Sequence, residues 1–208
     1  ETMETMYKLD AVNCQQYSQQ SPDNLTDMVL MVVLSIQQNW LSVGDQMLDV
    51  RKCGADSKFL WGNKIKTYEY LRDNSCQLYA DAMAVIDSDQ SDRDKARSLM
   101  EVFLRVTGLG IPKAGFVCQL MAGLVGCMDV HNIRMYGLDI KSLSLAKNPK
   151  TSKGIDANNK KVVAYIDMCH DIGTEKLWNN WCNFLATKSK KWRDGSHVSA
   201  VHYSYLTN

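Results

Sequence analysis

The stretch from Gly108 to Leu138 constrains the fold most, because it predicts a tight turn, a buried helix and the start of a second helix in succession. Gly108 and Gly110 flank a leucine, and both can take positive φ and leave backbone N–H groups uncovered. Pro112 is suited to the first position of a helix, whose N-terminus attracts anions. We therefore expect this turn to bind a phosphate.

An apolar helix and an acidic helix start follow the turn. The apolar run from Ala114 to Val125 fits a buried helix of about three turns. Asp129 is a good N-cap for a further helix through Tyr136. A carboxylate is thus expected one short helix away from the phosphate-binding turn, where it could cap a helix, take part in chemistry, or do both.

This stretch resembles the core of the helix-hairpin-helix DNA glycosylase superfamily. The pattern of that family is a Gly-hydrophobic-Gly hairpin, a lysine-containing helix start, an apolar helix and a hydrophobic-Asp-(Thr/Val)-His segment, which Met128-Asp129-Val130-His131 matches. The sequence from Gly126 to Asn132 is also similar to that of phage-type members related to the alpha-glutamyl/putrescinyl thymine pyrophosphorylases, which are proposed to act in thymine hypermodification. The specific match covers residues 108–138 of the 208-residue chain.

The resemblance and the helical periodicity together imply one all-α domain over residues 1–208 with two helical lobes. The lobes are expected at about 24–106 and 107–208, the second including the N-terminal arm, with the hairpin on one wall of a cleft and Asp129 at the cleft. No strand pattern of useful length and no internal repeat occurs in the sequence. The expected helices run from Leu25 to about Asp49, Lys64 to Ile86, Ser91 to about Val106, Asn159 to Asp171 and Thr174 to Lys188, with an exposed basic loop from Asp139 to Asp156.

The resemblance implies an enzyme that grips double-stranded DNA and cleaves the N-glycosidic bond of a flipped-out modified or damaged base. Asp129 would be its key carboxylate, because cleavage develops positive charge on the sugar. In bifunctional members the Schiff-base lysine lies two residues after the second hairpin glycine, whereas Lys113 lies one place later. We therefore expect a monofunctional DNA N-glycosylase with Asp129 and Lys113 as its catalytic residues. Lys113 would contact the reacting sugar or a phosphate, and its use as a nucleophile stays an open alternative.

Further DNA contacts are expected at the turn, after the aspartate and in a basic, aromatic segment near residue 190. These positions are Gly108, Leu109, Gly110, Ile111, Lys113, His131, Asn132, Lys190, Lys191 and Arg193. Trp61, Trp178 and Trp181 could stack on bases or lie in the core.

Two other functions fit the same residues. In one, the pocket accepts a pyrophosphorylated hydroxymethyl base, and an amine displaces the activated group without cutting the glycosidic bond. In the other, the chain is a non-catalytic duplex-DNA-binding module that uses only the hairpin.

Composition limits the cofactors and the location. Residues 105–208 carry 14 Lys and Arg against 7 Asp and Glu, so the second half is where a polyanion would bind. Seven scattered cysteines without C-x-x-C spacing suggest neither disulfides nor zinc. Some members of the family that the chain resembles hold an iron-sulfur cluster with four closely spaced cysteines near the C-terminus, where this chain has only Cys169 and Cys182, so no cluster is expected. Asp167, His170 and Asp171 have metal-binding spacing, but a solvated helix face is the simpler interpretation. We expect a cofactor-free monomer in the cytoplasm, or in the host cytoplasm if phage-encoded, without a membrane partner.

Overall fold

The computed structural model of the chain describes residues 11–36, 38 and 42–188. Every regular element in these residues is a helix, which confirms the all-α prediction. The elements in chain order are α1 Ala11–Ser18, α2 Pro22–Leu34, α3 Val43–Cys53, η3 Gly54–Asp56, α4 Asn63–Ile86, α5 Asp92–Leu104, α6 Ile111–Ala122, α7 Val130–Met135, η4 Ile140–Leu143, α8 Ser152–Ile172 and α9 Thr174–Lys188.

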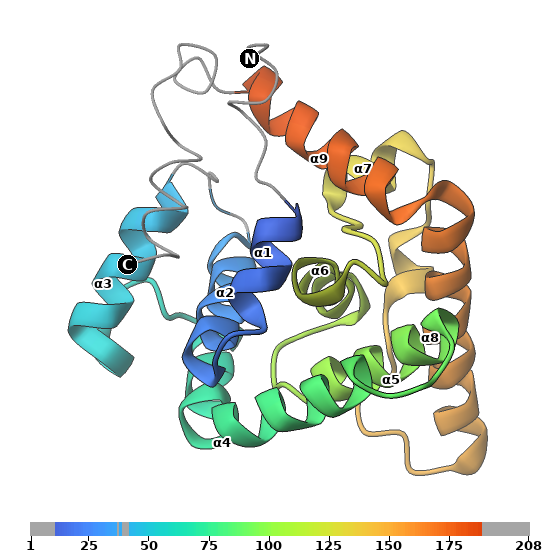
Figure 1. Cartoon of the computed structure of the whole chain (residues 1–208), viewed down its shortest axis with the longest axis horizontal. Helices are drawn as coiled ribbons and strands as arrows, with labels where there is room; N and C mark the ends of the chain where they lie inside the picture. The colour runs from blue at the N-terminus through green and yellow to red at the C-terminus, as the bar shows by residue number, and fades with distance from the viewer. Residues whose placement is uncertain (1–10, 37, 39–41, 189–208) are drawn as a thin grey trace.

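The apolar helix α6 lies in the middle of the molecule. Figure 1 shows it nearly end-on, with the other helices around it. Helices α1, α2 and α5 pack directly against it. Ile111 and all residues from Ala114 to Met121 are buried. The expected buried helix is therefore confirmed, and a helix that is buried all round needs neighbours on every side.

Helix α1 covers part of α6, in the region that the sequence analysis describes as an N-terminal arm. The Ser18 hydroxyl donates to the carbonyl of Leu120 at 3.3 Å, and the Gln19 side-chain amide donates to the carbonyl of Met121 at 2.7 Å. These bonds satisfy carbonyls at the C-terminal end of α6, which have no partner within the helix.

The helix predicted from Leu25 to about Asp49 is wrong, because α2 ends at Leu34 and α3 begins at Val43. The buried ammonium of Lys64 donates to the carbonyls of Leu34 at 3.1 Å and Ile36 at 3.0 Å. The last carbonyls of a helix lack intrahelical partners and attract positive charge. A lysine far along the chain therefore stabilises the end of α2, which local periodicity does not reveal.

The other predicted helices agree more closely with the structure. Helix α4 matches its predicted range, and α5 follows the expected cap, in which the Ser91 hydroxyl accepts from the backbone N–H of Asp94. Helix α9 carries Trp178 and Trp181, which pack edge-on against Phe116 of α6 with centroid distances of 6.4 and 4.9 Å. These two tryptophans therefore belong to the core.

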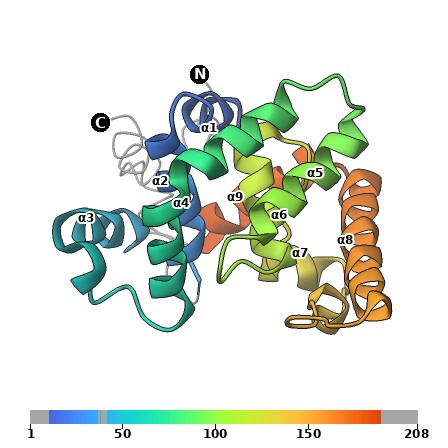
Figure 2. The same ribbon diagram turned by 90° about the horizontal axis from the view of Figure 1, so that it is seen from below.

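Helix α8 begins at Ser152, earlier than the predicted Asn159, because the Thr151 hydroxyl accepts from the N–H of Gly154 and caps it. The segment predicted as an exposed loop thus contains η4 and the start of α8. Figure 2 shows α8 at the edge of the molecule opposite α3. In the described part of the chain, no helix is long and apolar enough to cross a membrane.

Replacing Lys64 by Met should lower the free energy of unfolding by roughly 1–3 kcal/mol, because two carbonyls at the end of α2 lose their donor. Lys66→Met is the matched control, since Lys66 is exposed on the same helix and its loss should change stability by less than about 0.5 kcal/mol. Urea denaturation of both variants measures the difference. Equal stabilities would show that the Lys64 bonds contribute nothing.

Candidate functional site

The turn between α5 and α6 is built around Gly108, whose φ is 95°. A Cβ at this position would overlap the Thr67 hydroxyl and come within 3.0 Å of the Asn63 carbonyl. The same Thr67 hydroxyl donates to the carbonyl of Thr107 at 2.6 Å. The turn is therefore pressed against the start of α4, and only glycine fits there.

Gly110 differs from Gly108, because its φ of −95° and ψ of −179° are backbone angles that any residue can adopt. An added Cβ would meet nothing within 4 Å. Of the two glycines that can take positive φ, only Gly108 does so. The backbone N–H groups of Gly110, Ile111 and Lys113 donate to no acceptor among the described residues. These donors, at the N-terminus of a helix, suit an anion.

The side chains of Leu109 and Ile111 point inward and are buried. Any contact that these residues make with a ligand therefore runs through the backbone. The turn offers N–H groups on an apolar support, as the sequence predicted.

Lys113 lies in the first turn of α6 and is partly buried. Its ammonium lies 5.7 Å from the ring centroid of Phe116 and forms no hydrogen bond or ion pair within the described part of the chain. Burial lowers the pKa of Lys113, whereas the nearby Cys127 and Asp129 raise it. The structure therefore brings the two predicted catalytic residues into one electrostatic neighbourhood.

Asp129 is the N-cap of α7, as predicted. Its Oδ1 accepts from the backbone N–H of Asn132 at 2.9 Å, and its backbone is extended. No described residue donates to Oδ2, and the side chain is only partly buried. One oxygen is thus fixed by the helix start, which orients the carboxylate, and the other is left for a ligand.

The loop before Asp129 is held through its backbone carbonyls by α8. The Tyr165 hydroxyl donates to the carbonyl of Gly126 at 2.9 Å, and a ring nitrogen of His170 bonds to the carbonyl of Leu124 at 2.7 Å. Tyr165 reaches the loop by lying against Gly115 of α6, where a Cβ would overlap its ring. This close helix contact positions the segment that carries the carboxylate.

Asn132 fixes the same loop from the other side. Its side-chain amide donates to the carbonyls of Cys127 at 2.7 Å and Leu177 at 3.0 Å, and the residue is completely buried. Its Oδ1 accepts no hydrogen bond from any residue that the structure describes. The side chain therefore joins the loop to α9. The DNA contact expected of Asn132 stays a prediction.

His131 is partly buried and stacks on Phe184 of α9, with ring centroids 4.1 Å apart and planes inclined by 15°. Its expected DNA contact stays a prediction. The basic positions Lys190, Lys191 and Arg193 lie outside the described residues. In the described part of the chain, no group of His, Cys, Asp or Glu side chains could hold a metal. Asp167 instead pairs with Arg93 of α5.

Lys64 belongs to this neighbourhood, although the sequence did not single it out. Burial lowers its pKa, and the positive charge of Lys113 lowers it further. Its ammonium also lies 4.5 Å from the ring centroid of Trp61. No local sequence signal distinguishes Lys64 from the other lysines, because its role depends on contacts with α2.

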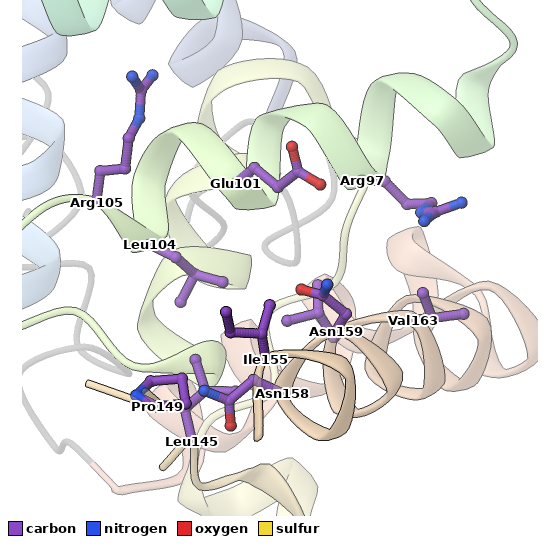
Figure 3. Close-up of a pocket in the computed structure, with 11 residues that line it drawn as sticks. Arg97, Glu101, Leu104, Arg105, Leu145, Pro149, Ile155, Asn158, Asn159 and Val163 are labelled. Atoms are coloured by element: carbon purple, nitrogen blue, oxygen red, sulfur yellow. The ribbon is translucent and has the colours of Figure 1, made fainter. Parts of the chain in front are cut away.

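A separate pocket of about 310 Å³ lies between α5 and α8 (Figure 3). Leu104, Leu145 and Ile155 give it an apolar lining, while Arg97 and Glu101 contribute charges of opposite sign. None of the sequence-predicted site residues lines it.

No family model, no curated protein and no solved structure matches the chain. Functional inference therefore rests on the residues and their geometry.

Lys113→Met should raise the melting temperature at neutral pH. The pKa of Lys113 is lower in the folded state than its ordinary value of 10.5, so protonation of Lys113 favours the unfolded chain. This penalty is fully present below the folded pKa and disappears as the pH rises through that value towards 10.5. The gain in Lys113→Met should shrink accordingly across a series of thermal melts. A gain that grows with pH would contradict the assignment.

Proposed function

We propose that this chain is a base-flipping DNA enzyme that resembles helix-hairpin-helix DNA glycosylases and cleaves the N-glycosidic bond of a modified or damaged base. The observation that carries the proposal is the placement of Lys113. An amine without a hydrogen-bond partner among the described residues lies near the carboxylate of Asp129, at the start of a helix with uncovered N–H groups. Perturbed titratable groups of this kind are typical of functional sites.

In this proposal, α5, the turn and α6 form the helix-hairpin-helix, and the N–H groups of Gly110 and Ile111 bind a DNA phosphate. Helices α2 to α5 belong to one lobe, and α6 to α9 with α1 form the other. Phosphate contacts position a protein on the duplex without reading its sequence. The turn would therefore place the DNA, and the neighbouring carboxylate would act on it.

The reacting base must leave the stack, because the atoms of its glycosidic bond are otherwise inaccessible. Asp129 would stabilise the positive charge that develops on the sugar and orient or deprotonate the attacking water. Its Oδ1 is held by the N–H of Asn132, so the carboxylate is preorganised and Oδ2 faces the substrate. Lys113 would contact the sugar or a phosphate without forming a Schiff base, which is consistent with its place three residues after Gly110.

Gly110→Val should weaken binding to duplexes of every sequence and lower the stability by no more than about 1 kcal/mol, because valine is a poorer N-cap than glycine. The protein leaves open space at this position and its φ is accessible to valine, so the new side chain would obstruct only an approaching phosphate. Fluorescence anisotropy with several labelled duplexes measures the affinity, and thermal melts control for folding. For the wild type, log affinity should fall linearly with log salt concentration. Similar affinities for variant and wild type, or a flat salt response, would oppose DNA binding at the turn.

Asp129→Asn should lower the rate of base release by roughly 100- to 1000-fold, because one preorganised electrostatic group is lost. DNA affinity should stay equal or improve, since repulsion from phosphates is removed. The helix start should survive, because Asn caps about as well as Asp. The measurement is mass spectrometry of free bases and nucleosides after incubation with duplexes that carry modified bases, followed by single-turnover kinetics on the substrate found. A variant that reacts within a few-fold of wild type would leave Asp129 as a helix cap only.

A further inference from the structure

Trp61 differs from the two described tryptophans of α9. Trp178 and Trp181 are each 3% exposed and pack on Phe116, whereas Trp61 is 46% exposed. The sequence allowed base stacking or core packing for all three. The structure places two of them in the core and leaves Trp61 partly exposed, so part of a large aromatic side chain is available to a ligand.

The Trp61 ring is held in place. The ammonium of Lys64 lies 4.5 Å from its centroid, within the range of a cation–π contact. That ammonium cannot drift, because it is buried and donates to the carbonyls of Leu34 and Ile36. The backbone is also fixed, since the Trp61 carbonyl accepts from the N–H of Lys64 at 3.0 Å. An exposed ring on such a support loses little conformational freedom when it binds a ligand.

Trp61 lies two residues before Asn63, the first residue of α4, and the start of α4 contacts the proposed DNA-binding turn. Asn63 approaches Gly108 so closely that a Cβ there would come within 3.0 Å of the Asn63 carbonyl. The charges of Lys64 and Lys113 interact, so the support of the ring is part of the same electrostatic neighbourhood as the candidate catalytic pair. A nucleic acid gripped at the turn would therefore pass close to the indole.

We propose that Trp61 is a stacking platform for an unpaired base, so that the preferred ligand is DNA with a base outside the helical stack. This inference rests on the proposed function and narrows its substrate class. Paired bases within a duplex have both faces covered by their neighbours, whereas an unpaired base offers a free π-face to an indole. Stacking of this kind tolerates any base.

The test compares two labelled duplexes of the same sequence at one salt concentration, one fully paired and one with a single-base bulge, and adds the single strand. Trp61→Ala should weaken binding to the bulged duplex by roughly 5- to 150-fold, and leave the fully paired duplex unchanged. Trp61→Phe should retain most of the affinity, because it keeps an aromatic face. Trp61→Leu is the matched apolar control, and should behave like Trp61→Ala.

The outcomes separate this inference from the proposed function. Three results would overturn the stacking role. Trp61→Ala could bind the bulged duplex as tightly as the wild type does, it could lose the same affinity for both duplexes, or Trp61→Leu could restore the affinity. Gly110→Val reports on the turn independently, since it should weaken both duplexes alike. Binding of the single strand alone, lost in Trp61→Ala, would support stacking and overturn duplex DNA as the substrate. If the wild type binds none of the three DNA ligands, both the stacking role of Trp61 and the proposed function are overturned.

Discussion

The buried ammonium of Lys64 is the interaction on which the arrangement of the candidate site depends. It satisfies carbonyls at the end of α2, and thereby joins that helix to the start of α4. The first turns of α4 in turn press on the Gly108 turn through Thr67. A charge that is buried next to several carbonyls is stabilised only in this geometry. The end of α2, the start of α4 and the start of α6 are therefore fixed relative to one another.

Helix α6 connects this arrangement to the two residues of the candidate site, Lys113 and Asp129. Its start carries Lys113, and the loop after its end leads to Asp129, so one buried helix and one short loop bring the two residues together. The loop keeps its shape because Tyr165 and His170 on α8 and Asn132 on α7 bind its carbonyls. Side chains of α7 and α8 that have no proposed catalytic role thus determine the position of the Asp129 carboxylate.

The sequence predicted what depends on local signals. The apolar run of α6 and the N-cap at Asp129 follow from patterns of a few residues, and the structure agrees with both. The break after Leu34 was missed, and the bond that stabilises the end of α2 comes from a lysine in another helix, which local periodicity does not include. The two glycines of the turn look alike in sequence, and only the contact of Gly108 with α4 separates them. Burial of Asn132 likewise depends on α9, which no local pattern includes.

Asp129 raises the question of whether a helix cap explains the whole arrangement. A cap accounts for Oδ1 and the backbone conformation, but it gives no reason for an amine nearby that has no hydrogen-bond partner among the described residues. Burial lowers the pKa of both Lys113 and Lys64, and their like charges disfavour each other, so the folded state is less stable than it would be with an apolar residue at position 113. Arrangements that reduce stability persist mainly at functional sites. The unfavourable environment of Lys113, more than the favourable cap at Asp129, therefore supports the proposal that the two residues serve chemistry.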